Sequence, residues 1–159
     1  MRIDLGGIAK LYILEAGRRV LETRGAARAL VNGGGDVVAH SAGEPWRVGV
    51  RDPRAPAALL GTILVVRGAV ASSGDYERPG HIVDPRTGQP AAGVRGVTLV
   101  GPSEAVNGLG PAIMVLGAAA GRELVRAAPG VEGLIVDASG ELWRSPGLAL
   151  EKGSGPFSR

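Results

Sequence analysis

Short apolar runs separated by glycine- and proline-rich turns constrain the fold of this chain most strongly, because each run is long enough for only one short element. The first run has an apolar residue at every fourth position (Ile8, Tyr12, Ala16 and Val20). This spacing predicts a helix from Leu5 to about Thr23, with these residues in its apolar stripe.

Local signals define the ends and the polar face of this helix. Asp4 is a suitable N-cap, and Gly25 is a suitable stop after the last turn. Arg18 and Arg19 lie in the later turns, where a cation favours the negative end of the helix dipole. We expect both arginines on the solvent-exposed face.

The rest of the chain alternates short strand signals with turns. Two helical segments, at 107–116 and 118–128, are separated by Gly117, and a final hairpin has Gly140 in its turn. This order differs from a βαβ alternation and predicts an α+β fold with a mostly antiparallel sheet packed by helices. The predicted strands are 27–31, 37–40, 46–51, a buried strand at 61–71, 97–100, 134–137 and 141–144.

Composition bounds the domain count and excludes several function classes. A chain of 159 residues with 45% hydrophobic content forms one domain, predicted at 1–145, followed by a loose tail at 146–159. Lys and Arg (18) barely exceed Asp and Glu (15) and are dispersed along the chain, so the sequence has no cluster of basic residues suited to binding nucleic acid. The sequence contains no cysteine, which excludes disulfides, cysteine-ligated zinc and a thiol nucleophile.

The composition also gives expectations for the location of the protein and for its few tryptophan and histidine side chains. No apolar run reaches the length of a membrane span, and Asp4 and Lys10 interrupt any signal-like stretch, so the default location is cytoplasmic. Trp46 and Trp143 are expected to pack in the core. His40 has no reactive neighbours in the sequence and is interpreted as a surface or packing histidine.

Two glycine-rich segments are candidate binding elements. Asn32–Asp36 contains three glycines whose backbone N–H groups suit an anion, and a tight turn is the alternative. Asp4–Lys10 places two glycines and a lysine at a helix start, which suits a phosphate. An ordinary capped helix with a solvated lysine is the alternative there.

A polar loop at 72–88 gathers hydroxyls, carboxylates, a phenol, arginines and a histidine. His81 is the candidate general base, because histidine is the side chain that titrates nearest neutral pH. Asp84 lies three residues further on and is expected to orient the ring. A solvated turn is the alternative, since Asp-Pro-Arg-Thr-Gly is also a good β-turn sequence.

Taken together and in order, these segments resemble the ApbE family, the FAD:protein FMN transferases. The resemblance covers roughly residues 3–145 and continues through Val97–Val100 and Ala112–Gly117. The segments that carry it are Asp4-Leu-Gly-Gly-Ile-Ala-Lys10, Asn32-Gly-Gly-Gly-Asp36, Trp46-Arg-Val-Gly-Val-Arg-Asp-Pro53, Ala69-Val-Ala-Ser-Ser-Gly-Asp-Tyr-Glu-Arg78 and His81-Ile-Val-Asp-Pro-Arg-Thr-Gly-Gln-Pro90.

The resemblance implies an α+β fold related to the T-fold, binding of FAD and Mg²⁺, and transfer of FMN from FAD to a threonine or serine hydroxyl of an acceptor protein, with release of AMP. It implies that His81 is the catalytic base and that Asp84, Thr87 and Gly88 hold the loop. It implies a metal site at the carbonyl of Gly7 and at Asn107. The residues implied for FAD binding are Lys10, Gly34, Gly35, Asp75, Tyr76 and Ile82.

Two departures from the family pattern leave the activity of this chain open. Asn107 stands where the family has a metal-binding aspartate, and Pro111 stands where it has a threonine, so a charged ligand and a hydroxyl ligand are lost. Family members are also considerably longer, so we expect a fragment, a half completed by a partner chain or N-terminal segment, or a degenerate relative. An export signal on such a segment would make the location periplasmic.

Two alternatives to the transferase therefore remain. The first is a non-catalytic flavin-binding or assembly module that has lost the metal site. The second is a small structural domain without a ligand, in which the glycines serve only as turns.

Overall fold

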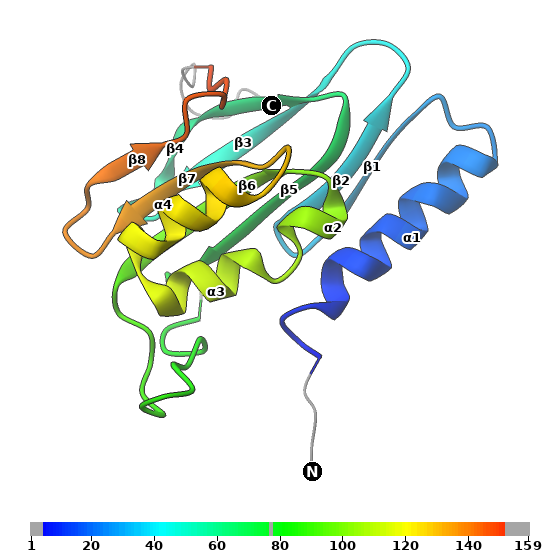
Figure 1. Cartoon of the computed structure of the whole chain (residues 1–159). Helices are drawn as coiled ribbons and strands as arrows, with labels where there is room; N and C mark the ends of the chain where they lie inside the picture. The colour runs from blue at the N-terminus through cyan, green and yellow to red at the C-terminus, as the bar shows by residue number, and fades with distance from the viewer. Residues whose placement is uncertain (1–4, 77, 152–159) are drawn as a thin grey trace.

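The computed structural model describes residues 5–76 and 78–151, and its strands form two antiparallel sheets (Figure 1). A hairpin of β3 (Trp46–Asp52) and β4 (Ala55–Val65) forms the smaller sheet. Every strand pair in both sheets is antiparallel, which confirms the predicted α+β class. The larger sheet has six strands in the order β1 (Arg28–Gly33), β2 (Asp36–Ser41), β5 (Arg67–Gly74), β6 (Val94–Gly101), β7 (Glu132–Asp137) and β8 (Leu142–Arg144).

The six-stranded sheet separates two hydrophobic cores. Successive side chains of a strand point to opposite faces, so neighbouring residues enter different cores. Val38 and Ala69 pack in the core beneath the helices, whereas Ala39 and Val70 pack in the core beneath the β3–β4 hairpin. The molecule is therefore layered as helices, sheet and hairpin (Figure 1).

Helix α1 (Ala9–Thr23) buries a different face from the one predicted. Leu11, Leu14 and Arg18 are buried against the sheet, whereas Tyr12 is 76% exposed and Val20 is 57% exposed. The predicted solvent-exposed position of Arg18 is therefore wrong. Carboxylates of the same helix neutralise the Arg18 guanidinium, which lets this face pack while the more apolar stripe stays outside.

The ends of α1 agree only in part with the prediction. The helix begins at Ala9 rather than at Leu5, and Asp4 lies outside the described residues. After Thr23 the chain turns at Gly25, whose φ of 86° is in the left-handed region, as predicted for the stop.

The predicted single strand at 61–71 is two strands in different sheets. Strand β4 ends at Val65, and β5 begins at Arg67 and pairs with β2 and β6. The change of sheet occurs at Val66, between the two strands, and Gly68 at the start of β5 has a φ of 129°. A Cβ at Gly68 would lie 2.7 Å from the carbonyl oxygen of Gly101, so this start of β5 requires glycine.

Three short helices connect β6 to β7: α2 (Ser103–Val106), which was not predicted, α3 (Leu109–Leu116) and α4 (Ala118–Ala127). Gly117 separates α3 from α4 with a φ of 90°, as expected. Gly140 lies in the left-handed region in the turn between β7 and β8, which confirms the predicted hairpin. Within the described residues, none of the helices is long and apolar enough to cross a membrane.

The aromatic and tail predictions have mixed outcomes. Trp46 and Trp143 are partly buried against the two cores, and His40 is buried with its ring Nε2 bonded to the carbonyl oxygen of Ala26, as a packing histidine. The prediction of a loose tail is wrong for residues 146–151. Leu148 is only 5% exposed, and the Glu151 backbone forms two hydrogen bonds with Thr62. The remaining residues of the predicted tail, 152–159, lie outside the described part.

Candidate functional site

Five separate segments of the chain enclose one pocket of about 850 Å³. They are the start of α1, the β1–β2 turn, the middle of β3, the end of β5 with its following loop, and the start of α3. The pocket thus brings together residues more than 100 positions apart. Eight of the predicted site residues line it, and Asp75 does not: the eight are Gly7, Lys10, Gly34, Gly35, Tyr76, His81, Ile82 and Asn107, which lies between α2 and α3.

The α1 wall is tied to the sheet by an ion pair. The Lys10 ammonium lies 2.8 Å from the carboxylate of Asp36, the first residue of β2. The same carboxylate accepts a hydrogen bond of 2.9 Å from the backbone N–H of Ser72 in β5. Asp36 is 7% exposed, so the pairing with Lys10 offsets the cost of burying its charge. Lys10 therefore has a partner, contrary to the interpretation as a solvated lysine.

The glycine-rich segment is both a tight turn and part of the pocket. Gly34 and Gly35 have φ values of 64° and 97° and join the paired residues Gly33 and Asp36. Positive φ at both central residues suits the twist of a two-residue hairpin. The Asn32 side-chain oxygen accepts a hydrogen bond of 3.0 Å from the Gly35 N–H. The two interpretations of this segment are therefore compatible.

The loop after β5 presents the His81 ring in a defined tautomer. Its Nδ1 lies 2.5 Å from the carbonyl oxygen of Arg78, which can only accept, so Nδ1 carries the proton. The Nε2 of the neutral ring then keeps its lone pair, which is the form that a general base requires. The His81 side chain is 41% exposed, and Asp75 Oδ1 lies 3.7 Å from Nδ1.

The predicted partner of His81 is wrong: Asp75, and not Asp84, lies beside the ring. Asp84 organises its own turn, where its carboxylate binds Arg86 at 2.7 Å and its carbonyl oxygen accepts the Gly88 N–H at 2.8 Å. The Arg86 guanidinium holds the pKa of the Asp84 carboxyl below its ordinary value. Asp75 also shapes the loop, because its carboxylate accepts the Gly80 N–H at 2.7 Å.

The α3 wall approaches the sheet closely. A Cβ at Gly110 would lie 2.6 Å from the hydroxyl oxygen of Ser73, so only glycine permits this approach. Gly108 precedes the helix with a φ of 74°. Pro111 lies in the first turn, where a backbone N–H has no partner within the helix, so its missing N–H costs no hydrogen bond. This backbone places Asn107 and Pro111 together on the pocket wall.

The donors in this pocket do not fit a divalent magnesium ion. Hard cations prefer carboxylate oxygens, and the described lining residues contain a single carboxylate, that of Asp36, which Lys10 neutralises. Asn107 offers only a neutral amide, and Pro111 offers no side-chain donor. Residues 5–76 and 78–151 contain no group of three His, Cys, Asp or Glu side chains able to hold a metal.

Sequence reasoning missed the cations that this pocket gathers. Arg51 enters it from β3 and Arg78 from the loop, so the described lining holds three cations, with Lys10, against one carboxylate. The Arg51 guanidinium carbon lies 5.9 Å from the centre of the Tyr76 ring. The sequence predicted a strand at 46–51 but not which residues of other segments its side chains would face. The described lining residues therefore carry more cationic side chains than carboxylates, which suits an anion.

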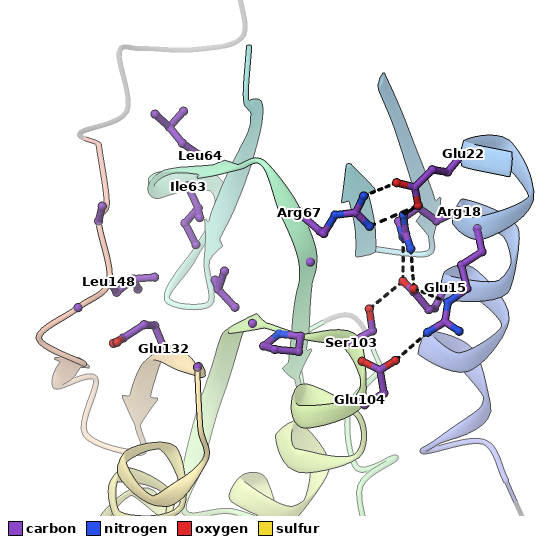
Figure 2. Close-up of a pocket in the computed structure, with 18 residues that line it drawn as sticks. Glu15, Arg18, Glu22, Ile63, Leu64, Arg67, Ser103, Glu104, Glu132 and Leu148 are labelled. Atoms are coloured by element: carbon purple, nitrogen blue, oxygen red, sulfur yellow. Dashed lines mark hydrogen bonds and ion pairs between the residues drawn. The ribbon is translucent and has the colours of Figure 1, made fainter. Parts of the chain in front are cut away.

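A second hollow of about 850 Å³ lies away from these residues, between α1, β4, β7 and the chain around Leu148 (Figure 2). Its charges satisfy one another: Arg18 binds Glu15 at 2.8 Å and Glu22 at 2.7 Å, and Arg67 also binds Glu22. Hydrogen bonds from Arg18 lower the pKa of Glu15 to about 2. Because the partners are internal, we interpret this cluster as structural.

Comparison with known proteins agrees with this arrangement. The family model described as the ApbE family matches residues 1–135. A protein of Treponema pallidum named FAD:protein FMN transferase is 34% identical over 158 residues, covering 86% of this chain and 44% of that protein.

Two solved structures share the fold. The ApbE protein of Thermotoga maritima has a TM-score of 0.82 and 37% identity, covering 91% of this chain and 52% of its own. The flavin transferase ApbE from Vibrio cholerae has a TM-score of 0.77 and 26% identity, and the match covers 91% of this chain and 50% of that protein. The chain thus spans about half the length of these relatives. The family match over most of the sequence establishes that this chain belongs to the ApbE family.

Proposed function

We propose that this domain binds FAD in the pocket that contains His81 and takes part in transfer of the FMN part to a threonine or serine hydroxyl of an acceptor protein. The observation that carries the proposal is the convergence of five segments around a pocket whose wall presents the His81 ring, held through Nδ1 by the Arg78 carbonyl oxygen. The names of the relatives support the same reaction class.

The chemistry requires one bond to form and one to break at the same phosphorus. The acceptor hydroxyl oxygen attacks the phosphorus of the FMN phosphate, the bridge to the AMP phosphate breaks, and AMP leaves. The hydroxyl proton passes to Nε2 of His81, while Nδ1 remains bonded to the Arg78 carbonyl oxygen. Such phosphoryl transfers depend mainly on positioning and on stabilisation of negative charge.

The roles of the other lining residues follow from their chemistry. Gly34 and Gly35 have no side chains, so a ligand can approach the backbone closely there. Tyr76 and Ile82 offer the aromatic and aliphatic surface that a flavin ring needs, and Asp75 holds the loop that carries His81. Lys10 joins the α1 wall to β2 through its ion pair with Asp36.

The test of this proposal uses the full chain, FAD and a threonine-bearing acceptor that the Vibrio cholerae flavin transferase modifies, produced without its flavin. We expect FAD to bind, and the acceptor to gain a mass equal to FMN minus water as AMP appears. The Vibrio cholerae protein serves as the positive control. Absence of FAD binding would contradict the proposal.

A second function is favoured by Asn107 and Pro111, namely a flavin-binding module without transfer activity. This reading predicts FAD binding with no change in acceptor mass. It is motivated by the described lining residues, whose single carboxylate, that of Asp36, is already paired with Lys10. The mass of the acceptor distinguishes the two functions.

The effect of Asn107 and Pro111 on metal binding can be tested by restoring the residues of the family pattern at both positions. We expect Asn107→Asp with Pro111→Thr to raise Mg²⁺ affinity by on the order of tenfold, because a carboxylate and a hydroxyl are added on one wall. Calorimetric titration of MgCl₂ with FAD present provides the measurement. Gln89→Glu, which adds the same charge on the exposed loop outside the pocket, is the control. Equal Mg²⁺ affinities would mean that these two positions do not form a metal site.

A further inference from the structure

We propose that the outer face of α1 is a dimer interface, at which two copies of this chain pack their α1 helices antiparallel about a two-fold axis. This face lies on the side of the helix opposite the buried residues Leu11, Leu14 and Arg18. It is outside the pocket that contains His81, so the inference does not depend on the proposed function.

An apolar stripe runs along this outer face, and Figure 1 shows α1 on the outer side of the molecule. Four large side chains of the stripe are each more than half exposed, and two alanines lie between them. Leu5 belongs to the stripe because its carbonyl oxygen accepts the Ala9 N–H at 2.9 Å, which continues the helical turn. The stripe consists of Leu5, Ala9, Tyr12, Ile13, Ala16 and Val20.

The stripe is not needed to hold α1 in place, because the opposite face of the helix already packs against the sheet. Apolar side chains gathered on one exposed face mark an interaction site, since their contact with water is unfavourable. A partner that covers the stripe removes this surface from water without moving the helix.

The charged residues of α1 do not oppose such a contact. Each of them is paired within the chain, and none belongs to the stripe. Covering the stripe therefore leaves no unpaired charge at the interface, a cost that would otherwise oppose association. These residues are Lys10, Glu15, Arg18, Arg19 and Glu22.

The order of side chains along the stripe identifies a second copy as the partner. In a two-fold dimer, residue i contacts residue j and j contacts i. The stripe has the same order of large and small residues in both directions from its midpoint between Tyr12 and Ile13. In an antiparallel pair, Leu5 therefore lies level with Val20 of the partner subunit, and the two central residues lie level with each other.

The small residues of the stripe suit close packing of two helices. Ala9 lies level with Ala16 of the partner subunit in the same arrangement, and the distance between packed helices depends on the side chains at the contact. An antiparallel order also places the positive end of each helix dipole beside the negative end of the other, whereas a parallel order would place like ends together.

The first experiment is sedimentation equilibrium of the full chain. We expect a monomer–dimer equilibrium with a dissociation constant on the order of 10 µM, because one helix face buries less area than a standard interface. Ile13→Glu places two carboxylates near the two-fold axis and is expected to weaken the dimer by at least about tenfold, through repulsion of like charges. Val66→Glu adds the same charge at a similarly exposed apolar residue outside the stripe and should leave the dimer unchanged.

The second experiment determines the orientation of the two helices. Because the sequence contains no cysteine, single cysteines can report contacts without background disulfides. Leu5→Cys and Val20→Cys are mixed and oxidised, and intact mass separates the mixed disulfide from the two symmetric ones. We expect the mixed disulfide in excess of the statistical ratio. Val66→Cys is the control and should form little disulfide.

Each contrary result overturns the inference in a different way. A chain that stays monomeric well above the expected dissociation constant would leave the stripe for another partner, such as the part of the relatives that this chain does not match. A dimer that Ile13→Glu does not weaken would place the interface elsewhere. An excess of symmetric disulfides would contradict the antiparallel order. None of these results changes the expectation for FAD binding, so the inference and the proposed function fail separately.

Discussion

Replacing His81 with glutamine is expected to slow FMN transfer by roughly 10²- to 10⁴-fold, the usual contribution of a general base. Glutamine can donate to the Arg78 carbonyl oxygen as Nδ1 does, but it has no basic lone pair to accept the acceptor's proton. FAD affinity is expected to change little, because the proton is accepted only during the reaction. The measurement is single-turnover transfer followed by the mass of the acceptor.

A pH profile separates a catalytic role from a structural one. A base must be unprotonated to accept a proton, so transfer by the unaltered chain should increase as the pH is raised. The His81→Gln variant should lose this rise. His40→Gln is the control, because His40 does not line the pocket and bonds only the Ala26 carbonyl through Nε2. Transfer at the original rate after His81→Gln would remove histidine from the reaction.

Replacing Arg18 with alanine is expected to destabilise the fold by about 3 kcal/mol, the lower end for breaking a buried ion pair. Its side chain is only 6% exposed, and the substitution removes the bidentate partner of the Glu15 carboxylate, which is 14% exposed and keeps only Arg19 and Ser103. The measurement is urea unfolding of the full chain followed by circular dichroism.

The adjacent residue provides the control for this substitution. Arg19 bonds the same Glu15 at 2.8 Å but is 61% exposed, so Arg19→Ala should cost less than about 1 kcal/mol. The double change Glu15→Gln with Arg18→Met removes both charges and should recover part of the loss. Equal costs for Arg18→Ala and Arg19→Ala would contradict the structural role assigned to burial.

The same ion pair gives the stability a definite pH dependence. Hydrogen bonds from Arg18 hold the pKa of Glu15 at about 2 in the folded chain, below the ordinary value of 4.5. A lowered carboxyl pKa stabilises the fold above the unfolded value, and this contribution is lost as the pH falls from about 4.5 to about 2. Unfolding of Arg18→Ala should be less sensitive to pH across that interval.

The local sequence predicted elements better than it predicted their partners. The 3.6-residue period identified α1, and glycines identified the ends at Gly25, Gly117 and Gly140, because positive φ is a local property of the backbone. The face of α1 was wrong, since burial of Arg18 depends on carboxylates that a hydropathy pattern counts only as polar. The single strand predicted at 61–71 was wrong because the change of sheet at Val66 leaves the apolar pattern intact.

The candidate site shows the same division. The glycine turns and the histidine loop were visible as segments, and the structure places them around one pocket. The neighbour of His81 is Asp75 rather than Asp84, because the turn at Asp84 folds back on Arg86 and consumes its carboxylate. The position of Arg51 in this pocket could not be predicted from its strand, since the other walls of the pocket are formed by distant segments.

The order of amino acids by itself determined the fold class, the family, and the segments from which a binding site is built, because these depend on local periodicity and on short motifs. Only the tertiary structure decided which charges meet. Lys10 meets Asp36 across 2.8 Å, and Arg51 and Arg78 enter one pocket from different segments. Coulomb energy depends on distance and on burial, and neither quantity can be obtained from positions along the chain.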